Sequence, residues 1–213
     1  MPGKNKASVG GKPLIQYSID VAVSSRAFAD ILVSSDDPEI ITLAAASHVK
    51  AFQRPAELAE DTTPITDVID HILSSLSNSY DAVMLLQPTA PLREPHHLTE
   101  AIKLLSDPTV NSVISVCEMQ DVHPARMYTL QAGLLQAFVP AFEQTRRQDI
   151  PPAYYRNGSI YLVRVEAFKK MKSVMVKPTA AYIMDRKYLC NIDDPRDLII
   201  AEALVKAWKE GTL

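Results

Sequence analysis

The chain has 213 residues, of which 47% are hydrophobic and 22% charged, and its formal net charge at pH 7 is -3. The ordinary apolar fraction and the small net charge exclude disorder as the main state, and the length suits one domain with or without an arm. A pI near 5.9 argues against a dedicated nucleic-acid binder. The sequence has no apolar run of the ~18 residues that a membrane span needs and begins with no apolar signal-peptide core. We therefore expect a cytoplasmic protein without a membrane partner.

Short β-branched runs alternate with longer amphipathic runs in the first half of the chain. Pro13 follows a Gly-Gly turn and predicts the start of a helix, because a proline at the first helical position loses no hydrogen bond. A strand over 30–35 and a helix over 38–48 are expected next. The entirely apolar run 82–86 is typical of a strand buried on both faces of a parallel sheet. A helix over 95–105 and a strand over 111–116 follow it.

The pattern breaks between residues 119 and 155, where the chain is rich in Gln, Pro and Arg and shows no clean period. This segment is either a loop system over the active edge or an arm that reaches a second subunit. A strand is expected over 160–163, and Asp194 is a good N-cap for a last helix that starts at Pro195. The alternation of strands and helices predicts one α/β domain over 1–213, with residues 119–155 as an inserted arm.

Polar residues lie where α/β proteins bind anionic or sugar ligands. Lys4 and Asn5 precede a glycine turn that leads into a helix N-terminus, which is a natural anion site, although a solvated N-terminal segment would carry the same residue types. Gln87 follows directly on a buried strand and can both donate to and accept from a sugar hydroxyl. The alternative for Gln87 is an ordinary Pro-rich connection to the next helix.

Two later groups are candidates for charge recognition. Arg146 and Arg147 could bind a carboxylate or phosphate through bidentate forks, although such a pair is more often plain surface charge. Asn191 and Asp193 lie just before the last helix, where their oxygens could hold Mg²⁺ together with substrate phosphates. No His or carboxylate is clearly placed as a general base.

Six ordered segments make the sequence resemble the acylneuraminate cytidylyltransferases, also called CMP-sialic acid or CMP-nonulosonate synthetases. The resemblance runs from about Pro2 to Trp208, and the segments are PGKN…GGKPLI, SSDD, RPAELAEDT, LLQPTAPLR, RRQDIPPAYYRNGSIYL and NIDDPRDL. It implies a Rossmann-like nucleotidyltransferase fold with a mostly parallel central sheet and a dimerisation arm. It also implies a homodimer that uses CTP and Mg²⁺ to activate a nine-carbon 2-keto sugar acid of the sialic, legionaminic or pseudaminic type, with release of pyrophosphate.

The resemblance also implies a role for each matching residue. Its motifs assign nucleotide binding to Lys4, Asn5, Arg54 and Thr63, sugar binding to Gln87 and Asn157, catalysis near the sugar carboxylate to Arg147 with Arg146, and metal binding to Asp193 and Asn191.

The sequence departs from the family pattern in three places. The family has a first strand and an Arg-, Gly- and Lys-containing loop ahead of the PGKN segment, and the sequence has neither, so we expect a sheet that lacks one central strand. Asn191 stands where the family has the first metal aspartate, which predicts weaker metal binding because an amide oxygen carries no charge. Ile65 replaces a serine that would face the cytidine.

Two other functions compete with this interpretation. Another sugar nucleotidyltransferase, such as one acting on an eight-carbon keto acid, would share the fold, but Arg146, Arg147 and Gln148 match the nine-carbon family specifically. The second alternative is a catalytically impaired or inactive homologue that only binds nucleotide or pairs with another subunit. The missing loop and Asn191 favour that alternative.

Overall fold

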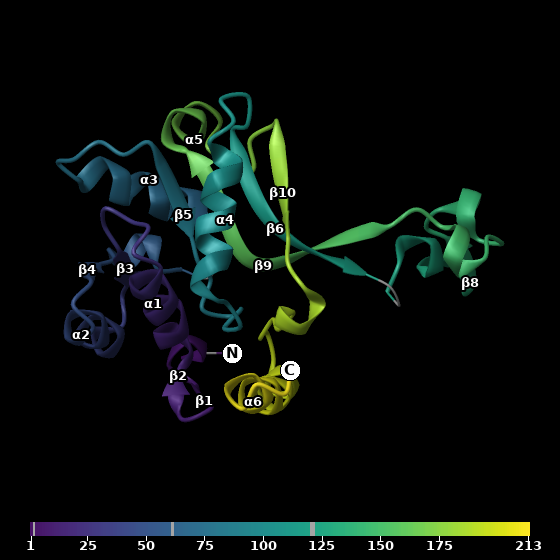
Figure 1. Ribbon diagram of the computed structural model, residues 1–213, viewed down its shortest axis with the longest axis horizontal. Coiled ribbons are helices and arrows are strands. Elements are labelled where there is room, and N and C mark those ends of the chain that lie inside the picture. The colour runs from purple at the N-terminus through teal and green to yellow at the C-terminus, as the bar shows by residue number, and fades with distance from the viewer. Residues whose placement is uncertain (2, 61, 120–121) are drawn as a thin grey trace.

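A four-stranded sheet forms the centre of the protein. The computed structural model describes residues 1, 3–60, 62–119 and 122–213 (Figure 1). The strands are β5 (Ala82–Leu85), β6 (Ser112–Met119), β9 (Ala153–Arg164) and β10 (Thr179–Ile183), in the order β10-β6-β9-β5. β10 runs parallel to β6, whereas β9 runs antiparallel to both β6 and β5. Three of the four strands therefore point the same way, as expected, but the insertion of β9 between them makes the sheet mixed.

Helices cover both faces of this sheet. On one face α1 (Leu14–Ser25) and α4 (Pro95–Leu105) pack with β6, β9 and β10 in a cluster that includes Val21, Leu98 and Ile160. On the other face α3 (Ile65–Ser75) and α5 (Val165–Met171) contribute Ile69 and Phe168 to a second cluster. The α/β class predicted from the alternating pattern is confirmed.

A separate pair of strands lies beside the central sheet. β3 (Leu32–Ser35) and β4 (Lys50–Gln53) are parallel and are connected by α2 (Pro38–Ala46). Within the described residues β3 pairs only with β4, and β5 pairs only with β9. A cavity of about 1170 Å³ lies between the free edges of β3 and β5 and is lined by α1 and α3 as well. The expected absence of one central strand therefore takes the form of a break in the sheet.

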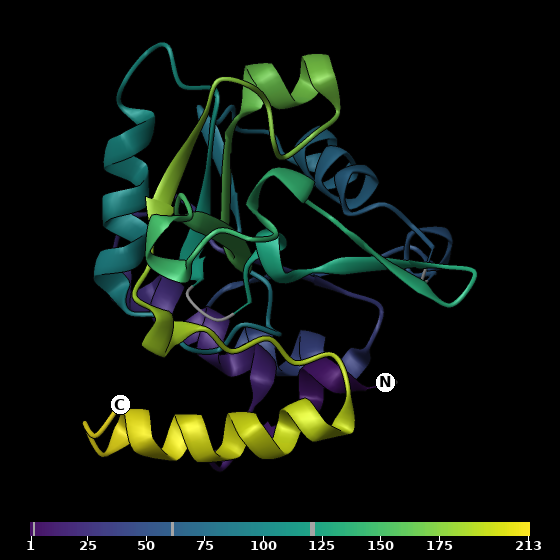
Figure 2. The same ribbon diagram turned by 90° about the vertical axis from the view of Figure 1, so that its right-hand side faces the viewer.

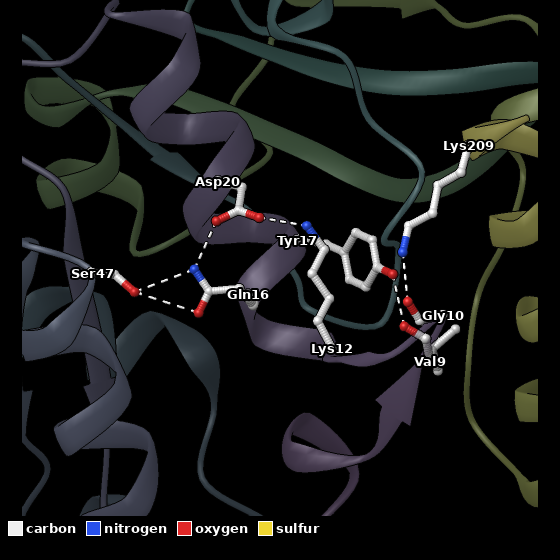
Figure 3. A network of polar contacts seen from close by, with 8 residues as sticks. All are labelled: Val9, Gly10, Lys12, Gln16, Tyr17, Asp20, Ser47 and Lys209. Carbon is white, nitrogen blue, oxygen red and sulfur yellow. Dashed lines mark hydrogen bonds and ion pairs between the residues drawn. The ribbon is translucent and has the colours of Figure 1, made fainter. Parts of the chain in front are cut away.

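The N-terminal segment is held by the last helix. η1 (Lys4–Lys6) leads into the short hairpin β1 (Ser8–Val9) and β2 (Lys12–Pro13), and α6 (Pro195–Lys209) packs against it. Figure 3 shows Lys209 of α6 donating to the carbonyl of Gly10, and Tyr17 donating to the carbonyl of Val9 at 2.7 Å. Glu202 of α6 accepts from the backbone N–H of Gly10 at 2.7 Å. These bonds fix the segment that precedes α1.

An arm projects from the body of the molecule, and Figures 1 and 2 show it from two sides. Its elements are η3 (Pro124–Arg126), the hairpin β7 (Tyr128–Gln131) and β8 (Leu134–Ala137), η4 (Pro140–Phe142) and η5 (Arg147–Asp149). Leu130 and Leu134 of the hairpin are 72% and 71% exposed. Gln120 and Asp121, which fall within the predicted arm, lie outside the described residues.

Several boundaries differ from the sequence-based expectations. Pro13 is the N-cap of α1 rather than its first helical residue. β9 begins at Ala153, inside the predicted arm, and is longer than the strand expected over 160–163. The sequence analysis did not single out β4, α3, α5, β10 or the short turns η2 (Ala56–Leu58) and η6 (Arg186–Tyr188). In the described part of the chain, none of the helices combines the length and the apolar character needed to cross a bilayer.

Candidate functional site

The N-terminal segment meets the start of the last helix at a carboxylate. Lys4 in η1 donates to Asp193 at 3.1 Å from its Nζ to Oδ1, and the side-chain amide of Asn191 donates to the other oxygen of Asp193. Asp193 is largely exposed, with 67% of its side chain accessible. Two predicted metal-binding residues and one predicted nucleotide-binding residue therefore lie together, although Lys4 and Asp193 are 189 positions apart.

Asp197 fixes the backbone that carries this carboxylate. Its Oδ2 accepts from the backbone N–H groups of Asp193 at 2.9 Å and Asp194 at 3.1 Å. These backbone hydrogen bonds lower the pKa of the Asp197 carboxyl, because they stabilise its charged form. Asp194 in turn accepts from the N–H of Asp197 at 3.0 Å, which completes a capping box and confirms Asp194 as the N-cap.

Gln87 faces a glycine of β9 across the carboxyl end of β5. Gly158 has a φ of +74°, and a Cβ atom there would lie 3.2 Å from Oε1 of Gln87 and 3.7 Å from Oδ1 of Asn191. The side-chain oxygens of Gln87 and Asn191 therefore converge on the open side of Gly158. The site thus combines a predicted sugar-binding residue with the predicted metal-binding group.

Asn157 points the other way, into the core. Its Oδ1 accepts from the hydroxyl of Ser115 at 2.6 Å and from the N–H of Ser159 at 3.2 Å, and its Nδ2 lies 3.4 Å from the sulfur of Cys117. The residue is 2% exposed. The position of this side chain does not support the predicted sugar contact; it anchors the irregular part of β9 in which Gly158 faces Gln87.

Asn5, Arg54 and Gln87 line the cavity between β3 and β5. Arg54 donates to the backbone carbonyl of Ser34 at 2.7 Å and to its hydroxyl at 3.3 Å, so its guanidinium lies across the carboxyl end of β3. Carboxyl ends of strands are where open α/β sheets bind ligands. Asn5, Arg54 and Gln87 are therefore at one edge of the fold, as the nucleotide- and sugar-binding predictions require.

Three predicted residues lie elsewhere. Thr63 sits in the loop before α3, where its hydroxyl is 3.4 Å from the carbonyl of Glu57, and it does not line the cavity. Arg146 and Arg147 lie on the projecting arm, and Arg146 forms an ion pair with Asp149 at 2.8 Å. The arm that carries these arginines projects from the body of the molecule (Figure 1).

The oxygen atoms near Gly158 are of the kind that Mg²⁺ prefers. The Asp193 carboxylate and the Asn191 and Gln87 amide oxygens are hard donors, and Mg²⁺ commonly uses one or two carboxylates with water and substrate phosphates. The described residues contain no cluster of three or more His, Cys, Asp or Glu side chains that could form an all-protein metal cage. The donor set fits a metal that arrives with a phosphate-bearing substrate.

The sequence analysis missed Gly158 and Asp197 as parts of the site. A glycine at positive φ directly after an asparagine is a signal for a special backbone position, and an aspartate three residues after an N-cap is a signal for a capping box. Neither signal indicates which distant side chain lies opposite.

Comparison with known proteins gives consistent similarities. The model of a family described as cytidylyltransferase matches residues 1–198. An N-acylneuraminate cytidylyltransferase of Streptococcus agalactiae is 33% identical over 93% of this chain, which spans only 48% of that relative. A pseudaminic acid cytidylyltransferase of Campylobacter jejuni is 30% identical and a CMP-N,N'-diacetyllegionaminic acid synthase of Legionella pneumophila is 29% identical, each over 99% of this chain and 93% of its own length.

Solved structures show the same fold at lower identity. A CMP:2-keto-3-deoxy-manno-octonic acid synthetase complexed with CTP superposes with a TM-score of 0.72 at 17% identity, covering 98% of this chain and 93% of that one. A 4-diphosphocytidyl-2C-methyl-D-erythritol synthase gives 0.67 at 11% identity, with 95% and 94% coverage.

Proposed function

The chain belongs to the cytidylyltransferase family, and from this premise we propose that it transfers CMP from CTP to a nine-carbon 2-keto sugar acid. The observation that carries the proposal is a chain of contacts: Gln87 and Asn191 face Gly158, and Asn191 and Lys4 both donate to Asp193. The relatives named for N-acylneuraminate, pseudaminic acid and diacetyllegionaminic acid support this acceptor class. We place the reaction in the cytoplasm.

The proposed reaction is a displacement at phosphorus. The anomeric hydroxyl oxygen of the sugar forms a bond to the α-phosphorus of CTP, the bond from that phosphorus to the β-phosphate oxygen breaks, and pyrophosphate leaves. The hydroxyl proton passes to solvent or to a base. The residues' task is to position the two substrates and to balance charge, as in other phosphoryl transfers.

The residues divide this task by location. Asn5 and Arg54, which line the cavity, would bind the nucleotide, and Gln87 would hydrogen-bond a sugar hydroxyl. Mg²⁺ bound through Asp193 and Asn191 would neutralise phosphate charge. Lys4, which pairs with Asp193 in this structure, would be free to contact a phosphate if a metal ion took its place on the carboxylate.

The arm suggests how the two arginines take part. It carries exposed apolar side chains, among them Leu130, Leu134, Leu135 and Phe138, and exposed apolar side chains gathered on one projecting segment favour a protein partner. We propose a homodimer in which the arm of one copy lies on the other and brings Arg147 towards that copy's sugar carboxylate. Light scattering of the L130S variant should then show a shift towards monomer, whereas a monomeric wild type at micromolar concentration would exclude the dimer.

Pyrophosphate release tests the activity directly. The protein is incubated with CTP and Mg²⁺ and, in parallel, with N-acetylneuraminate, legionaminate, pseudaminate or an eight-carbon 3-deoxy keto acid as acceptor. We expect turnover with one of the nine-carbon acids and little with the eight-carbon acid. Turnover with the eight-carbon acid alone would replace the proposed acceptor class, and silence in all four wells would contradict the activity of this chain.

The alternative of an inactive nucleotide-binding homologue is favoured by one specific observation, the break in the sheet next to the nucleotide-facing residues. Calorimetry with CTP separates the two. Binding of CTP without turnover supports the alternative, and turnover with any acceptor removes it.

A further inference from the structure

Arg93 is a buried cation at the end of the LLQPTAPLR segment, and neither the sequence analysis nor the proposed chemistry assigns it a role. It ends the Pro-rich connection that starts at Gln87, and it is 2% exposed. No carboxylate among the described residues forms an ion pair with it. Burial lowers the pKa of its guanidinium to about 9, so the group still carries its charge at neutral pH. A buried charge without a counter-ion lowers the stability of the fold. We therefore looked for a function that the hydrogen bonds of Arg93 could serve.

The guanidinium joins three elements that surround the site. Its Nη1 donates to the carbonyl of Ser159 in β9 at 2.8 Å, and its Nη2 donates to the carbonyl of Gln87 at 3.1 Å and to the hydroxyl of Ser18 in α1. Its Nε has no partner in the described part of the structure. A planar guanidinium with several donors in fixed directions can hold three acceptors at once, which the single ammonium of lysine cannot do in the same geometry.

Two of these acceptors lie beside the contact between Gln87 and Gly158. The Gln87 carbonyl lies on the residue whose amide faces Gly158, and the Ser159 carbonyl lies one residue after Gly158. One side chain therefore ties the backbone of Gln87 to the backbone next to Gly158. Asn157 holds the same part of β9 from the core, through Ser115 and Ser159.

We propose that Arg93 is a positioning residue that fixes the distance between Gln87 and Gly158 and so determines how well the acceptor sugar is bound. The inference rests on the proposed function for its substrate. A purely structural Arg93 would lower the amount of folded protein, whereas a positioning Arg93 changes the KM for the sugar.

The test compares R93K and R93M with F168L, a core variant on the opposite face of the sheet. Phe168 is fully buried in the cluster with Ile69, so its truncation lowers stability without touching the contact between Gln87 and Gly158. We expect R93K and R93M to raise the KM for the sugar about tenfold while the KM for CTP changes less than about twofold. F168L should lower Tm and leave both KM values unchanged. An unchanged sugar KM in R93K and R93M would overturn the proposal.

Hydrogen exchange gives a readout that does not depend on turnover. In R93K, backbone amides over 85–92 and 156–160 should exchange about tenfold faster relative to the rest of the sheet, and F168L should not show this local pattern. The wild type could turn over no acceptor while R93K still shows faster exchange confined to these two segments. The proposed function would then fail, but the positioning of Gln87 and Gly158 by Arg93 would hold. If exchange rises evenly through the sheet in R93K, the positioning role is wrong.

Discussion

Lys4 lies 3.1 Å from Asp193, the carboxylate through which we propose that Mg²⁺ binds, so we expect the two cations to compete for it. An exposed ion pair contributes about 0.2–1 kcal/mol. Removing the ammonium in K4M should therefore raise the affinity for Mg²⁺ alone by up to about fivefold, while the affinity for CTP falls because a phosphate-binding cation is lost. Titration calorimetry with each ligand measures both changes.

Lys6 provides the matched control for that prediction. It lies on the same short helix but pairs with Asp37 and Glu39 at the start of α2, at 2.9 and 3.0 Å. K6M should leave Mg²⁺ affinity as it is. Parallel losses of Mg²⁺ and CTP affinity in K4M would contradict the competition.

Gly158 lies so close to Gln87 that a side chain at this position would touch the glutamine. In G158A the new methyl group would lie 3.2 Å from Oε1 of Gln87, and the positive φ itself costs about 1–2 kcal/mol for an alanine. G133A is a matched control, because Gly133 has a φ of +83° and nothing within 4 Å of its Cβ position. Both variants should lose similar stability in thermal unfolding, but only G158A should raise the KM for the sugar. Equal KM values in the two variants would place the sugar elsewhere.

Among the elements, the hairpin before α1 depends on a close approach to α6. A Cβ atom at Gly10 would lie 2.5 Å from Cγ1 of Val205, which is fully buried, whereas one at Gly11 would meet nothing within 4 Å. Both glycines have positive φ. G10A should therefore lose about 1–3 kcal/mol more stability than G11A, because it adds overpacking to the same backbone strain.

Denaturant unfolding of the two hairpin variants measures this difference. Lys4 lies on the segment just before the hairpin, so its position should be less fixed in G10A. The CTP affinity of G10A should therefore fall more than that of G11A. Equal unfolding free energies in G10A and G11A would mean that α6 gives way and does not fix the hairpin.

Elements with a strong local signal were predicted from the sequence, and those that depend on distant partners were not. The Asp194 cap of α6 and the apolar run that forms β5 are local features, and the cap and the strand are confirmed. The expected burial of this strand on both faces of a parallel sheet is wrong, because β5 is a half-buried edge strand whose partner β9 is antiparallel. The first half of β9 was hidden because the polar residues from Arg156 to Ser159 separate it from the apolar run that follows. Within the site, the residue types of Gln87 and Asp193 were informative, but only the fold brings Lys4 to Asp193 or Arg93 behind Gln87.

At the scale of the whole molecule, the main feature is the break between β3 and β5. The cavity there, about 1170 Å³, exceeds the range of about 300–1,000 Å³ usual for small-molecule pockets. Unpaired strand edges in apolar surroundings leave backbone groups without partners. Tyr80 donates to Asp30, and these residues lie just before β5 and β3, so the two strands start beside each other at one end of the cavity. The cavity therefore combines unpaired strand edges with an apolar lining, and one more strand could satisfy both.

We expect an apolar strand of about five β-branched residues, joined ahead of the chain by a flexible linker, to raise Tm by about 5 °C or more. The added strand would pair with the free edges of β3 and β5, and its carboxyl end would emerge near Asn5, which lines the cavity. The control is the same fusion with proline at alternate positions, which keeps the apolar character but removes half of the N–H donors. Thermal unfolding is combined with hydrogen exchange over 32–35 and 82–85, where only the unbroken strand should protect the amides. An equal gain in Tm from the proline fusion would show that apolar burial alone fills the cavity, and no gain from either would mean that β3 and β5 do not accept a strand between them.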